Sequence, residues 1–321
     1  MTIVEHLQEL YDLPAFTFPL PDEGEKVTLP EPDAVAWALR GDAYGEGEEE
    51  WEEVFARFLE TVDTTRVRAL IVGAWSEAYD TDSSAIVAAL LAARERLPEL
   101  KALFVGDLTM EEAEISWITQ SDLTGLLRGF PALEEFGVRG GSGLALSAVR
   151  HGRLRSLTIE TGGLGVEVVR GVAESELPAL ERLDLWLGTG EYGADAEVSD
   201  LAPFLTGERL PSLRHLALRN SSIQDDIAIA LATAPVVARL EVLDLSMGTL
   251  GDRGAEALLS GQSLTHLQTL DLDHHYIGEE LQRRLRETLG PAGVQVLLDP
   301  DGAEEYDDGD GEPSRYVAIS E

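Results

Sequence analysis

The sequence predicts an α/β solenoid shaped like a horseshoe, with about ten parallel strands on its concave face and helices on its convex face. The first observation is a pattern. Residues 210–277 contain three copies of L-x-x-L-x-L, each with an apolar residue five positions further on: LPSLRHLALRNSSI, ARLEVLDLSMGTL and LTHLQTLDLDHHYI. The second is that segments of helical periodicity separate the copies. Such a unit cannot bury its own apolar face, so it must stack on neighbours.

Residues 1–33 do not repeat, and we expect them to form an N-terminal cap. A short amphipathic segment, VEHLQELY, leads into FTFPLPDEGEKVTLPEPD, where the prolines exclude a helix. The cap would cover the exposed apolar end of the first repeat.

The predicted repeat array spans residues 34–293, and one further strand follows it. The strands are recognised by the apolar residue at the fourth position of the pattern. That series is Trp37, Leu70, Leu103, Phe136, Leu157, Leu183, Leu216, Leu243, Leu270 and Val296. Between the strands the apolar period changes from two to 3.6 residues, which predicts convex-side helices at 48–62, 83–97, 225–234, 252–261 and 279–290.

Residues 294–321 are predicted to hold the last strand, an acidic mobile loop and a C-terminal cap. The composition of 301–312 cannot bury enough apolar surface to order itself. The final residues, SRYVAISE, alternate in polarity and are expected to return as a strand or patch over the last repeat.

The strand and helix pattern resembles the leucine-rich repeat family, in its ribonuclease-inhibitor-like branch and of the bacterial cytoplasmic type. The segment LGDRGAEALLSG is the best single match to that branch. The resemblance implies a non-enzymatic binding module. The ninth position of the motif departs from it, because Ser221, Gly248 and His275 stand where the family usually has Asn or Cys.

Charge and composition narrow the class of partner. Sixty acidic residues against twenty-four Lys and Arg give a net charge of −36, which repels phosphate backbones and argues against nucleic acid. The surplus either keeps the protein soluble or favours a basic partner. The chain has no cysteine, no apolar run of membrane-spanning length and no signal peptide, so we expect a monomer in the cytoplasm without membrane contact.

Residues between the repeat leucines should project onto the concave face and form ladders across adjacent strands. The N-terminal half of that face is predicted to be small and apolar, and the C-terminal half to be charged. The candidate partner-binding residues are Asp184, Trp186, His215, Arg219, Asp244, Asp271 and Asp273. Asp244 beside Asp271 is the pair that most needs a compensating partner, which could be Arg182, His215, a cation or a basic protein. Trp186 has the character of an aromatic anchor.

The favoured hypothesis is an interaction scaffold that binds a protein, possibly basic, on the concave face. Two alternatives stay open at this point: a cation-binding or catalytic protein that uses the concave Asp and His side chains, and a regulator of a nucleotide-hydrolysing partner. The run DLDHHYI invites a metal interpretation, but alternate residues of a strand point to opposite faces. We therefore predict no metal, no cofactor and no catalytic residue.

Overall fold

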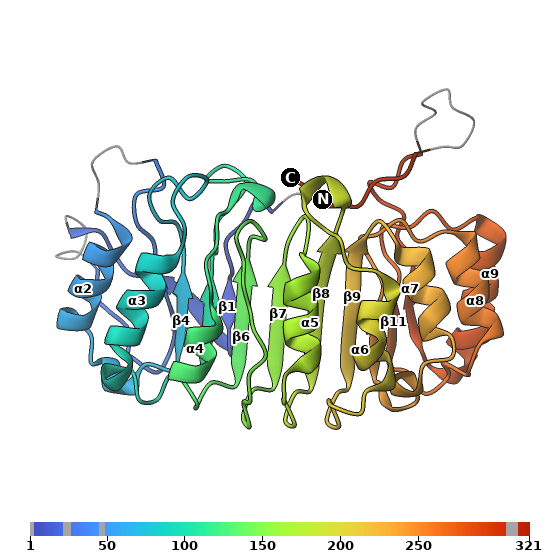
Figure 1. The fold of residues 1–321 in the computed structure, drawn as a ribbon, viewed down its shortest axis with the longest axis horizontal. Helices are drawn as coiled ribbons and strands as arrows, with labels where there is room; N and C mark the ends of the chain where they lie inside the picture. The colour runs from blue at the N-terminus through green and yellow to red at the C-terminus, as the bar shows by residue number, and fades with distance from the viewer. Residues whose placement is uncertain (1–2, 22–26, 45–48, 306–313) are drawn as a thin grey trace.

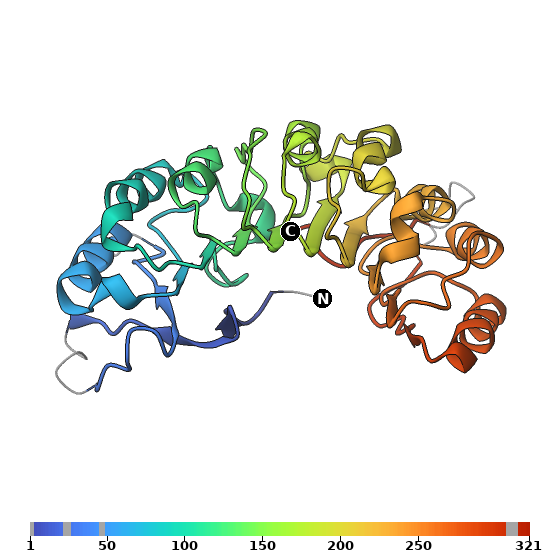
Figure 2. The same ribbon diagram turned by 90° about the horizontal axis from the view of Figure 1, so that it is seen from below.

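The computed structural model describes residues 3–21, 27–44, 49–305 and 314–321, and it has the predicted fold class. Within these ranges twelve strands form one open sheet in chain order, from β1 to β12. β1 and β2 are antiparallel, and the later neighbours are parallel. The sheet lines the inside of an arch and the helices lie outside it (Figures 1 and 2).

The strands have the following bounds: β1 Glu9–Leu10, β2 Leu13–Thr17, β3 Ala36–Leu39, β4 Ala69–Val72, β5 Ala102–Val105, β6 Glu135–Arg139, β7 Ser156–Glu160, β8 Arg182–Gly188, β9 His215–Ser221, β10 Val242–Asp244, β11 Thr269–Asp271 and β12 Gln295–Leu297. The ten predicted strands are β3 to β12, which confirms them. The fourth-position residues pair in register along the whole series, as Leu216, Leu243 and Leu270 do. β1 and β2 lie inside the segment expected to be a cap.

The α-helices that the described residues contain are α2 Trp51–Thr61, α3 Ser84–Ala92, α4 Thr124–Gly129, α5 Val166–Glu174, α6 Ala202–Thr206, α7 Gln224–Leu231, α8 Asp252–Ser260 and α9 Glu279–Leu289. The five predicted helices correspond to α2, α3, α7, α8 and α9. The core lies between the helices and the sheet, and Leu216, Leu243 and Leu270 are fully buried in it.

The N-terminal residues extend the sheet at its first edge and then enter the hollow of the arch. β2 pairs with β3, and the ring of Phe16 packs edge-on against Trp37 at 5.5 Å between centroids. Residues 3–8, before β1, lie inside the arch (Figure 2). These residues therefore do more than cap the first repeat, because they also cover part of the concave face.

Residues 314–321 run along the upper edge of the sheet to its centre (Figure 1). Tyr316 contacts the turn after β11, near the last repeat that we expect this segment to cover. Ile319 and Ser320 reach further back, to Trp186 on β8 and to the loop before α4. Of the predicted mobile loop, residues 306–312 lie outside the described residues, while Glu305 forms an ion pair with Arg315 at 2.9 Å. The domain boundaries at 33 and 293 stay a prediction.

Candidate functional site

The N-terminal half of the concave face is apolar, as predicted, but the chain covers it with its own residues. Small and apolar side chains of β3, β4 and β5 form a floor: Ala36, Ala38, Ala69, Ile71, Ala102 and Phe104. Leu7, Leu10, Tyr11 and Leu13 pack on this floor. This half of the face is therefore occupied by an internal segment in the absence of a partner.

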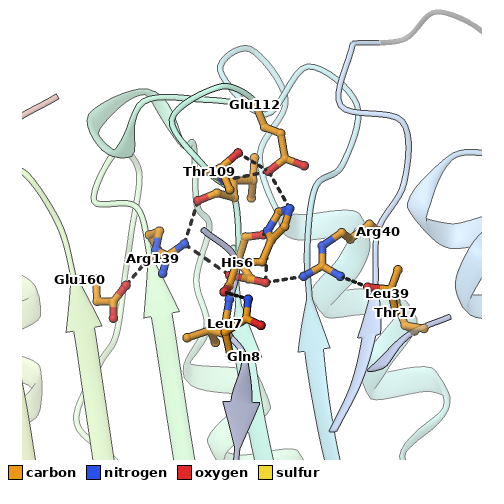
Figure 3. Close-up of polar contacts among 12 residues, drawn as sticks. His6, Leu7, Gln8, Thr17, Leu39, Arg40, Thr109, Glu112, Arg139 and Glu160 are labelled. Carbon is orange, nitrogen blue, oxygen red and sulfur yellow. Dashed lines mark hydrogen bonds and ion pairs between the residues drawn. The ribbon is translucent and has the colours of Figure 1, made fainter. Parts of the chain in front are cut away.

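The buried carboxylate of Asp107 holds that segment in place, and Figure 3 labels its partners His6, Leu7, Arg40 and Arg139. The side chain of Asp107, just beyond β5, has no exposed surface, and its Oδ1 accepts a hydrogen bond from the Leu7 backbone N–H at 3.0 Å. Arg40 donates to Oδ2 at 2.7 Å, and Arg139 lies 3.4 Å from Oδ1. His6 adds a ring nitrogen 3.4 Å from Oδ2. The carboxylate therefore joins the N-terminal segment to two strands of the sheet.

The pKa of Asp107 reflects this arrangement. Burial by itself would raise it, but hydrogen bonds from His6 and from the Leu7 N–H lower the pKa of Asp107 below its usual range. The two guanidinium groups act in the same direction. Asp107 is therefore ionised, and its carboxylate oxygens contact Leu7, Arg40 and Arg139 of the same chain.

The C-terminal half carries the predicted charged ladder, and Arg219 organises it. Arg219 on β9 donates to both oxygens of Asp184 on β8, at 2.9 and 2.8 Å. Its guanidinium also lies 3.6 Å from Asp244 on β10. Of the predicted site residues, Asp184, Trp186 and Asp244 are buried, whereas His215, Arg219, Asp271 and Asp273 are partly exposed.

Asp271 on β11 is the carboxylate that this arginine compensates least. It pairs in register with Asp244, as the ladder predicted. Its Oδ1 accepts the Asp273 backbone N–H at 3.0 Å. Burial first, and then the charge of Asp244, raise the pKa of Asp271 to about 6. A carboxylate with a raised pKa on an accessible face is a candidate binding site for a cationic group of a partner.

His215 lies in the row beside this ladder, between Arg182 on β8 and Val242 on β10. Burial, with the nearby charge of Arg182, lowers the pKa of His215 to about 4. The imidazole is therefore neutral at pH 7. Its Nε2 has no hydrogen-bond partner among the described residues.

Trp186, the aromatic anchor that we expect from the sequence, is covered by the chain's own residues. Its side chain points onto the concave side beneath the guanidinium of Arg219, 5.0 Å from the ring centroid. However, it is only 7% exposed, because Ile115, Met247 and Ile319 pack on it. This cover could not be predicted from the repeat pattern, because Ile115, Met247 and Ile319 lie in loops and in the C-terminal segment.

The C-terminal segment that covers Trp186 is bound as an extended peptide. Asn220, at the end of β9, accepts the Ile319 N–H at 3.1 Å and donates to the Ile319 carbonyl at 2.6 Å. The Ala318 N–H donates to the Met247 carbonyl at 2.8 Å. Tyr276 donates its hydroxyl hydrogen to the Tyr316 carbonyl at 2.8 Å. These turn residues were not among the predicted functional residues.

The metal interpretation of DLDHHYI finds no support in the geometry. Among the described residues there is no group of three His, Asp or Glu side chains placed to hold a metal ion. His274 instead bonds with its ring to the carbonyls of Asp301 and Tyr316. His275 is buried, and its Nδ1 accepts the Ile277 N–H at 3.0 Å.

Comparison with known proteins agrees with the fold. A leucine-rich repeat family model matches residues 209–232 and 240–259. A protein of Bacteroides fragilis has a similar crystal structure, with a TM-score of 0.78, 26% identity, and 94% of this chain and 81% of that chain covered. An internalin of Listeria monocytogenes is far less similar, at a TM-score of 0.36 and 16% identity over 75% of this chain and 55% of that one. No curated protein matches the chain.

Fold, repeat pattern and family model together define the class: the chain folds as a leucine-rich repeat solenoid, an architecture that generally serves as a protein-interaction scaffold. None of the helices that the structure describes is long and apolar enough to cross a membrane.

Proposed function

We propose that this protein is an interaction scaffold that binds a basic segment of another protein on the C-terminal half of its concave face. The observation that carries the proposal is Asp271, a half-buried carboxylate whose pKa is raised to about 6 on an accessible part of the sheet. A Lys or Arg side chain from a partner would pair with Asp271 and offset its repulsion by Asp244.

Charge on this half of the face supports a cationic partner. Arg219 is shared between Asp184 and Asp244, at 2.8 and 3.6 Å, so it cannot also neutralise the carboxylates further along the ladder. Asp271 and Asp273 follow on the next strand and its turn, and both are partly exposed. Below them, Val242 and Thr269 give a partly exposed surface of low charge. Together these residues suit a segment with basic and aliphatic side chains.

The occupied N-terminal half also supports this location. The apolar floor of β3 to β5 is covered by Leu7, Leu10 and their neighbours, and Trp186 is covered by the C-terminal segment. A partner that leaves both segments in place would therefore meet β9 to β11 first. We further propose the ribonuclease-inhibitor-like branch, because strand and α-helix alternate regularly from β9 to α9, and a cytoplasmic location, because the chain has no cysteine.

Site-specific photo-cross-linking in cells tests the proposal. A photoreactive amino acid at Thr269, on the concave strand β11, should capture one major partner. The same amino acid at Ser260, exposed at the end of the convex helix α8, is the matched control. Capture that is equal at both positions, or confined to Ser260, would contradict the concave location.

A further inference from the structure

One of the five tryptophans lies on the surface, and it does not belong to the concave face. Trp37, Trp51, Trp75 and Trp186 are all buried, whereas Trp117 is 57% exposed. Trp117 ends the short 3-10 helix Ile115–Trp117, in the long loop between β5 and α4. Burying a side chain of this size gains substantial free energy, so its exposure is a feature that folding alone does not explain.

Three other large apolar side chains are exposed in the same region. Tyr44 is 58%, Tyr79 is 49% and Met110 is 43% exposed. They lie in the loops that follow β3, β4 and β5, at the upper edge of the arch (Figure 1). We call Tyr44, Tyr79, Met110 and Trp117 the aromatic rim.

Hydrogen bonds hold these loops together as one surface. The Thr119 N–H donates to the Ala78 carbonyl at 2.7 Å, and the Thr119 hydroxyl donates to the Tyr79 carbonyl at 3.2 Å. The Tyr44 hydroxyl donates to the Glu111 carbonyl at 2.6 Å. These hydrogen bonds join the three loops, so the residues of the aromatic rim lie on one continuous surface.

The loops after β4 and β5, which carry Tyr79, Met110 and Trp117, hold acidic side chains and no basic ones. Residues 73–83 contain three acidic residues and residues 106–123 contain five, and neither stretch has a Lys, Arg or His. Within the described part of the chain, six of these carboxylates have no ion pair with a basic side chain: Glu77, Asp80, Asp82, Glu111, Glu114 and Asp122. Arg40 and Arg139 pair with the buried Asp107, so they do not neutralise these exposed carboxylates.

We propose that the aromatic rim is a second docking surface, and that it binds an extended, arginine-rich segment of a protein partner. A guanidinium group can stack flat on Trp117 or Tyr79 while its N–H groups bond to neighbouring carboxylates. A lysine ammonium provides the charge without the planar stacking surface. The rim lies on the edge of the sheet, so this inference goes beyond the concave-face proposal and stands without it.

Trp117 also provides the measurement. Because the other four tryptophans are buried, acrylamide should quench mainly the fluorescence of Trp117 in the full-length protein. We would titrate the protein with a synthetic peptide of alternating Gly and Arg, and with matched peptides that carry Lys or Gln instead. The arginine peptide should protect Trp117 from quenching at lower concentration than the lysine peptide, and the glutamine peptide should not protect it.

Variants separate the rim from general attraction to an acidic protein. Tyr79→Ala should weaken binding of the arginine peptide about threefold to tenfold, whereas Ile229→Ala, an exposed apolar residue on convex helix α7, should leave it unchanged. Glu77→Gln with Glu114→Gln should weaken binding more than Glu60→Gln with Glu95→Gln, which removes the same charge elsewhere.

Three results would overturn the proposal. Equal effects of the two double variants would show attraction by net charge alone. Binding of the arginine peptide without protection of Trp117 would place it on another surface. If Asp271→Asn then abolished that binding, the concave face would be its site, so the rim proposal would fail while the concave-face proposal would be supported.

Discussion

Arg219 and Asp184 form a two-point ion pair across the adjacent strands β8 and β9, with N–O distances of 2.9 and 2.8 Å. Asp184 is almost completely buried, and it also lies 3.5 Å from Arg182. The guanidinium of Arg219 therefore offsets most of the charge repulsion at Asp184 and only part of it at Asp244, which lies 3.6 Å away.

Removing the guanidinium should be costly, because it leaves buried carboxylates without a counter-charge. We expect Arg219→Met to lower the free energy of unfolding by about 3 to 5 kcal/mol in urea titration. Arg283→Met is the control, since Arg283 pairs with Glu280 and Glu287 on the exposed face of α9. The control should change stability far less, because solvent screens an exposed ion pair. An equally small loss for Arg219→Met would show that the pair does not support the ladder.

Asp271 should make stability depend on pH in the opposite sense to most carboxylates. The pKa of Asp271 is raised from 3.8 to about 6 in the folded state. Between these two values the folded protein keeps a proton on Asp271 that the unfolded chain has lost. The penalty is thus present above pH 6 and disappears as the pH falls towards 4. Asp271→Asn should raise the free energy of unfolding at pH 7.5 by roughly 1 kcal/mol, after allowance for solvent screening, and by much less at pH 4.5. A gain of the same size at both pH values would contradict the raised pKa.

The C-terminal segment should control access to Trp186. Ile319→Asp places a charge against Trp186, Ile115 and Met247, and we expect it to release the segment. In a Trp117→Phe background, acrylamide quenching should then increase. Ile319→Val keeps an aliphatic side chain and is the matched control. Unchanged quenching in the Asp variant would show that Trp186 is covered by other residues.

The periodic part of the fold could be predicted from the sequence, and the covering segments could not. Leu216, Leu243 and Leu270 recur at a regular spacing because each repeat buries the same face, so the pattern determines strand, register and core together. The contacts of Leu7 with Asp107 and of Asn220 with Ile319 join residues about a hundred positions apart, and no period marks them. For that reason the ladder of Asp244 and Asp271 was predicted correctly, while the burial of Trp186 was not.

The most direct test of the central proposal uses the partner captured through Thr269 and measures its association rate at several salt concentrations. Asp271→Asn with Asp273→Asn should slow association and flatten its salt dependence, because exposed charges of an interface mainly steer the encounter of the two proteins. Glu60→Gln with Glu95→Gln removes the same two negative charges from another part of the protein, and it should change the association rate much less. If both double variants associate like the unaltered protein, the acidic half of the concave face is not where the partner binds.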